Sequence, residues 1–89
     1  MQAVYKYPIE TTDYQWVPMP NGAEILCVQV QRGQPCLWAK VETADWVPVV
    51  KRAIIVVGTG HKFEGVGYKY IGSYKLHDGD FVGHVFEAT

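Results

Sequence analysis

Hydrophobic and polar residues alternate over much of the chain, in short runs that turn signals separate. A period of two is the pattern of a β-strand, whose successive side chains point to opposite faces of a sheet. The alternation predicts an all-β fold, a small barrel or sandwich of about six or seven mostly antiparallel strands with little or no helix. We expect a single domain over residues 1–89, since the chain has no internal repeat and no linker. The expected strands cover residues 2–7, 14–17, 23–31, 36–42, 51–57, 68–76 and 81–87.

The clearest pair of strands covers residues 23–31 and 36–42, with a short turn between them. Their alternation predicts a hairpin at the centre of the core, in which Leu37 lies near Val28. On the first strand, Leu26 is expected to share the face of Val28, because the two residues are two positions apart.

A glycine-rich segment interrupts the pattern between residues 54–57 and 68–76. The first of these stretches is an unbroken aliphatic run, which predicts a strand buried on both faces. The second alternates and predicts a returning strand, in which Gly72 indicates a bulge or a close neighbour. Between them lies a loop with four glycines, Gly58, Gly60, Gly65 and Gly67.

Composition and charge narrow the classes of function. At 89 residues the chain has a thin core, which favours a homo-oligomer. The formal net charge is −1, so no basic field attracts nucleic acid, and we expect no nucleic-acid partner. No apolar run approaches the length of a membrane span, and residues 1–10 lack the apolar core of a signal peptide. We therefore expect no membrane association and a cytosolic site of action.

Several stretches resemble a family of small, uncharacterised proteins of tailed bacteriophages and prophages. They are YKYPIETTDYQWVPMPNGAEILCVQV, VQVQRGQPCLWAKV, VVGTGH and YIGSYKLHDGDFVGHVFE, which together cover nearly the whole chain. The resemblance implies a phage-borne accessory protein that acts in the cytoplasm of the infected bacterial host, and it transfers no catalytic residue. In related sequences a proline is expected where Lys62-Phe63 follows His61, so the conformation of this loop is expected to differ here.

The glycine-rich loop is the candidate ligand site. Backbone N–H groups of a glycine loop that follows a strand can point at a phosphate, and Gly58 and Gly60 would supply them. Cationic and aromatic side chains near the loop suit a nucleotide-like small molecule, with its phosphate on the cations and its base stacked on a ring. These side chains are His61, Lys62, Phe63, Tyr68 and Lys69. The alternative is an ordinary hairpin loop whose glycines satisfy positive φ angles, which is the commoner case.

Other chemistry is poorly supported by the sequence. Three histidines, His61, His77 and His84, are too few and too scattered to predict a metal site, and His84 alternates with apolar residues like a core or interface histidine. Cys27 and Cys36 form no CxxC pair and are expected to be free thiols. We see no catalytic constellation, so we expect a protein that is not an enzyme and needs no cofactor.

Two functions remain open. The first is stoichiometric capture of a nucleotide-like ligand by a phage protein, as a counter-defence sponge for an immune signal. The second is inhibition of a host defence factor through an aromatic surface or an exposed strand edge. Trp46 is the best candidate for an exposed interaction residue, because it lies beside Asp45 and Pro48 in an irregular segment. A ring that covers one end of the barrel is the alternative for Trp46.

Overall fold

The computed structural model describes residues 1–88, which form an all-β fold of seven strands, as the alternation predicted. The strands are β1 (Gln2–Pro8), β2 (Gln15–Pro20), β3 (Glu24–Gln31), β4 (Gln34–Glu42), β5 (Val49–Gly58), β6 (Tyr68–Leu76) and β7 (Phe81–Ala88). A single 3-10 turn, η1 (His77–Gly79), joins β6 to β7. No helix in residues 1–88 is long and apolar enough to cross a membrane.

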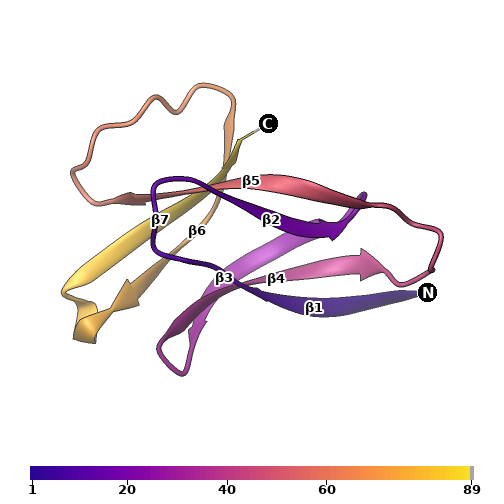
Figure 1. The fold of residues 1–89 in the computed structure, drawn as a ribbon. Coiled ribbons are helices and arrows are strands. Elements are labelled where there is room, and N and C mark those ends of the chain that lie inside the picture. Colours follow the sequence, from indigo (N-terminus) through magenta and orange to yellow (C-terminus); the bar gives the residue numbers. More distant parts are fainter. Residues whose placement is uncertain (89) are drawn as a thin grey trace.

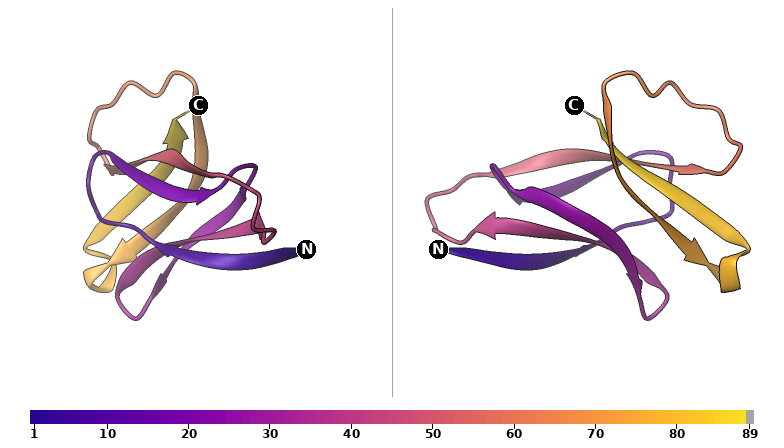
Figure 2. Two further views of the ribbon diagram at one scale, coloured as in Figure 1. Left: turned by 45° about the vertical axis from the view of Figure 1, so that its right-hand side comes forward. Right: turned by 180° about the vertical axis from the view of Figure 1, so that it is seen from behind.

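The strands form two antiparallel sheets, one with the order β1-β4-β3 and the other with the order β2-β5-β7-β6. The sheets lie face to face, and the long connection between β5 and β6 extends beyond the end of the second sheet (Figures 1 and 2). Residues from both sheets meet in one core between the layers. Its most deeply buried side chains are Ile9, Met19, Leu37, Ile54, Val41, Val85 and Cys36.

The predicted hairpin is present as β3 and β4, and Leu37 pairs with Val28 as expected. The expectation for Leu26 was wrong. A β-bulge between Ile25 and Cys27 shifts the register, so Ile25 packs against the core and Leu26 is 46% exposed. A bulge inserts one extra residue into a strand, and the faces of the residues on either side of it no longer follow simple alternation.

Both expectations for Gly72 are confirmed. The β6–β7 register shifts between Tyr70 and Gly72, which marks a bulge. A Cβ atom at Gly72 would lie 3.0 Å from Cγ1 of Val28, so β6 and β3 approach closely at this point. Glycine therefore lets the edges of the two sheets come together.

The fifth strand is buried on both faces over part of its length, as its aliphatic run predicted. Ile54 and Val56 point into the core between the sheets, with 0% and 4% of their surface exposed. Ile55 and Val57 alternate with them and point to the outer face, yet they are also buried, at 6% and 8% exposed. The outer face of the second sheet is therefore covered beside β5, and the glycine-rich loop lies there.

Candidate functional site

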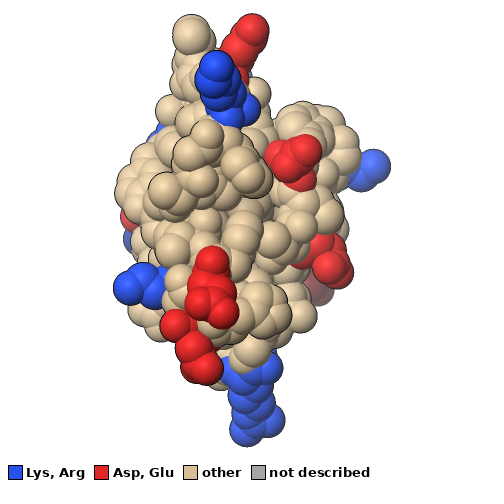
Figure 3. All heavy atoms as spheres, turned by 90° about the vertical axis from the view of Figure 1, so that its left-hand side faces the viewer, with Lys and Arg blue, Asp and Glu red and all other residues tan. Residues whose placement is uncertain are grey.

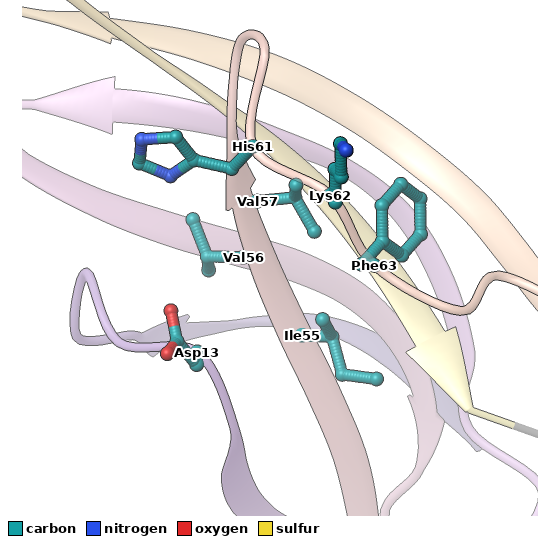
Figure 4. Close-up of a pocket in the computed structure, with 7 residues that line it drawn as sticks. All are labelled: Asp13, Ile55, Val56, Val57, His61, Lys62 and Phe63. Atoms are coloured by element: carbon teal, nitrogen blue, oxygen red, sulfur yellow. The ribbon is translucent and has the colours of Figure 1, made fainter.

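A pocket of about 370 Å³ lies beside the C-terminal part of β5 (Figure 4). The connection between β1 and β2 supplies Asp13, and the glycine-rich loop supplies three more side chains. Figure 4 shows Asp13 and His61 on one side of β5, with Ile55 and Phe63 on the other. The complete lining is Asp13, Ile55, Val56, Val57, His61, Lys62 and Phe63.

The loop starts and ends in tight turns that glycine makes possible. At its start, the N–H of His61 donates to the carbonyl of Gly58 over 3.0 Å, and Gly60 has a φ of +85°. At its end, the N–H of Tyr68 donates to the carbonyl of Gly65 over 3.2 Å. A φ near +85° is strained for residues with a Cβ atom, so the first turn depends on Gly60.

The imidazole of His61 lies against the backbone of Gly58. A Cβ atom at Gly58 would be 3.0 Å from Nδ1 of His61, a space that only glycine leaves open without displacement. A second depression, of about 380 Å³, lies on the side of His61 nearer the turn between β6 and β7, and its lining includes Asp80 and Phe81. The His61 ring therefore separates two hollows.

Phe63 is held in place by other aromatic rings. Its ring is stacked on Tyr68, at 6.3 Å between centroids, and is tilted against Phe86 at 5.1 Å. Tyr70 in turn contacts Phe86 edge to face, at 5.4 Å between centroids. Since Phe63 remains 45% exposed and lines the pocket, its ring offers a supported flat surface for a ligand.

The pocket has a mixed electrostatic character. Lys62 contributes a positive charge, His61 an imidazole and Asp13 a carboxylate. Outside the pocket, the face displayed in Figure 3 carries charged groups of both signs, scattered over mainly uncharged residues. This distribution suits a small ligand with a local charge better than a polyanion, which needs an extended basic surface.

The structure brings together only part of the predicted ligand site. Of the predicted residues, His61, Lys62 and Phe63 line the pocket, and Gly58 lies under His61. Gly60 shapes the turn and is exposed.

Two more predicted residues lie outside the lining. Tyr68 lies behind Phe63, and Lys69 is exposed on β6, where its register partner is Glu87 on β7. The sequence prediction missed Asp13, Ile55, Val56 and Val57. Asp13 comes from a different connection, and the aliphatic run that contains the other three predicts only a buried strand.

The histidines do not converge on a metal site: no group of potential metal ligands occurs in residues 1–88. His84 is partly buried on β7 and takes part in a chain of hydrogen bonds. Its Nδ1 lies 2.8 Å from the hydroxyl of Ser73, and its Nε2 lies 2.7 Å from the hydroxyl of Thr59. Tyr70 extends the chain, 2.8 Å from Ser73. In a catalytic triad, one ring nitrogen of the histidine is hydrogen-bonded to a carboxylate. Both ring nitrogens of His84 lie beside hydroxyl groups instead.

Two further expectations concern single residues. Trp46 is 81% exposed in the connection between β4 and β5, so its ring does not cover the end of the sandwich. Cys27 and Cys36 are both free, as expected, and Cys36 is buried.

Comparison with protein-family models assigns a family to the chain. A family model described as a domain of unknown function, DUF7352, matches residues 1–89. No curated protein and no solved structure matches the chain.

Proposed function

The chain belongs to the DUF7352 family, and from its pocket we propose that it is a non-enzymatic binding protein for a nucleotide-like small molecule. One observation carries this proposal. A supported aromatic ring, a lysine and a histidine line the same hollow of about 370 Å³ at the end of β5. The volume falls in the range of small-molecule sites, roughly 300–1,000 Å³.

Each side chain has a role that follows from its chemistry. Phe63 offers a flat surface on which a base can stack, since every base has a π-face. Lys62 and the ring N–H of His61 donate hydrogen bonds to a phosphate, and such charge-assisted bonds are stronger than neutral ones. Asp13 accepts a hydrogen bond from a ribose hydroxyl or from an amino group on the base.

The biological setting is part of the proposal. The resemblance to proteins of tailed bacteriophages supports a phage-encoded protein that works in the cytoplasm of the bacterial host. There it would sequester a nucleotide-like immune signal, which requires a tight pocket and no catalytic group. The thin core of an 89-residue chain supports assembly into a homo-oligomer.

Calorimetric titration with nucleotides tests the proposal, starting with nucleoside monophosphates, cyclic nucleotides and ADP-ribose. Lys62→Met should weaken binding about tenfold or more, because it removes a charge-assisted hydrogen bond. Lys75→Met is the matched control, since Lys75 is exposed on β6 and lies outside the pocket lining. Absence of binding to every nucleotide, or equal loss in both variants, would contradict the proposal.

An exposed aromatic surface supports a second function, inhibition of a host protein. Tyr14 and Trp16 are 50% and 56% exposed and contact each other edge to face at 5.4 Å. With Trp46 they provide the aromatic side chains that dominate protein interfaces. A host partner whose binding is lost in Trp16→Ser or Trp46→Ser but kept in Lys62→Met would favour this function over ligand capture.

A further inference from the structure

The prolines of β2 determine which main-chain groups of β5 face β2. Pro18 is paired with Lys51 in the register, but proline has no N–H and cannot exchange hydrogen bonds with Lys51. In an antiparallel pair, bonded and non-bonded positions alternate. The residue before Pro18 therefore forms a hydrogen-bonded pair, Val17 with Arg52. Two positions further from Pro18, Gln15 and Ile54 form the next hydrogen-bonded pair.

The same alternation continues along β5 beyond Ile54, where β5 extends past the first residue of β2. Ile54 is the last residue of β5 paired with β2, and two residues later Val56 points its N–H and C=O in the same direction. No strand pairs with Val56 on this side, and no hydrogen bond from elsewhere in residues 1–88 reaches it there. Its neighbours Ile55 and Val57 direct their main-chain groups the other way, toward β7.

The composition of the pocket wall agrees with this assignment. Ile55, Val56 and Val57 all line the pocket, although neighbouring side chains in a strand point to opposite faces. The side chain of Val56 belongs to the core, and only 4% of the whole residue is exposed, so we assign the small part of Val56 that meets the pocket to its main chain. The pocket therefore runs along the open edge of β5.

The open edge is too short for an added peptide strand. Ile54 is occupied by Gln15, and the carbonyl of Gly58 accepts the N–H of His61. Val56 is the one position between them whose main chain has no hydrogen-bond partner on this side. Strand addition draws its affinity from several main-chain hydrogen bonds in succession, so a planar ring fits this edge better than an extended peptide.

We propose that the main chain of Val56 reads the edge of an amino-bearing nucleobase. Its N–H requires an acceptor and its C=O requires a donor, side by side on the ligand. Adenine presents such a pair in its N7 acceptor and N6 amino donor, and cytosine carries an amino donor at N4. Inosine and uridine carry a carbonyl oxygen in place of the amino group, which would leave the Val56 carbonyl without a partner.

This inference rests on the proposed function, and one titration separates the two. AMP, CMP, IMP, UMP and ribose 5-phosphate are each titrated into the intact protein. An amino-bearing nucleotide should bind at least about tenfold more tightly than its carbonyl counterpart, AMP over IMP or CMP over UMP. Equal binding within both pairs would overturn the inference and keep the proposed function. Ribose 5-phosphate binding as tightly as the nucleotides would overturn both, because the base would then contribute nothing to affinity. Failure of all five to bind would overturn the inference, and the proposed function as well if cyclic nucleotides and ADP-ribose also fail to bind.

Amide hydrogen exchange followed by NMR gives a second readout. In the free protein the Val56 amide should exchange faster than that of Val57, which is bonded to β7. Saturation with the tightest-binding nucleotide should slow exchange at Val56 about tenfold or more and leave Val57 unchanged. A Val56 amide that is already as protected as Val57 in the free protein would overturn the assignment of the open edge.

Discussion

The ring of Tyr74 lies directly on Gly83 in the neighbouring strand. A Cβ atom at Gly83 would lie 2.7 Å from Cζ of Tyr74, closer than real contacts allow. Tyr74 is 4% exposed, and its hydroxyl is 2.8 Å from that of Thr11, so the ring is packed and tethered. The β6–β7 pairing therefore depends on the missing side chain at Gly83.

Gly83→Ala should lower the free energy of unfolding by about 1–3 kcal/mol, the usual cost of adding atoms to a packed core. Urea denaturation followed by tryptophan fluorescence measures the change. Gly58→Ala is the matched control, because Gly58 is the register partner of Gly83 and meets only the exposed His61 ring. Equal stability of the two variants would show that Tyr74 can move aside.

Gly58→Ala should instead affect the ligand site. Its new Cβ atom would lie 3.0 Å from Nδ1 of His61, and this exposed ring can swing away at little cost in stability. We expect a free energy of unfolding within about 0.5 kcal/mol of that of the unsubstituted protein. Nucleotide affinity should fall severalfold, because the His61 donor is displaced. Unchanged affinity in the calorimetric titration would remove His61 from the ligand site.

The sequence pattern predicted the seven strands from local signals, which were alternation and, for β5, an aliphatic run. It ended the second strand at residue 17, whereas β2 extends to Pro20. It failed at Leu26, because nothing in an alternating run shows where a bulge inserts an extra residue. For the site, the sequence predicted His61, Lys62 and Phe63, which are neighbours in one loop. It could not predict Asp13, whose place beside β5 depends on how β2 pairs.

The contribution of Val56 was hidden for a different reason. Side-chain patterns report which face of a strand is buried, and the aliphatic run predicts only that Val56 is buried. Its main chain is open because β2 begins opposite Ile54 and extends no further along β5. Pro18 was the available signal, since a proline within a strand indicates an edge and fixes the alternation of its hydrogen bonds.

Alkaline pH should destabilise the fold through Tyr74. Burial raises the pKa of the Tyr74 phenol above its ordinary value, and the hydrogen bond with Thr11 offsets part of the shift. Because the folded state holds the neutral phenol, this contribution is fully present below the unfolded pKa of about 10. It is lost as the pH rises from there through the higher pKa of the folded state.

Unfolding free energies measured between about pH 8 and 11 test this prediction. They should fall as the pH rises in the unsubstituted protein and fall less steeply in Tyr74→Phe. Tyr7, whose pKa burial also raises, leaves a residual slope in that variant. Identical slopes for the two proteins would assign the alkaline effect to residues other than Tyr74.

The ion pair between Arg52 and Glu87 should contribute more to stability than the surface pair between Lys40 and Glu24. Arg52 contacts Glu87 through both Nε and Nη2, and its Nη1 donates to the carbonyl of Ala23 over 2.8 Å. The hydrogen bond to Glu87 raises the pKa of Arg52, so the guanidinium stays charged while it joins β5, β7 and the residue before β3.

Glu87→Gln should lower the free energy of unfolding by about 1–3 kcal/mol, because it weakens charge-assisted hydrogen bonds at a largely buried position. Glu24→Gln is the control, since Glu24 and Lys40 are 58% and 44% exposed and 3.3 Å apart. Solvent screens such a pair, and its loss should cost less than about 1 kcal/mol. Urea denaturation at neutral pH compares the two variants. If Glu24→Gln proved the more destabilising, the link that Arg52 makes between the strands would not be what holds this end of the sheets together.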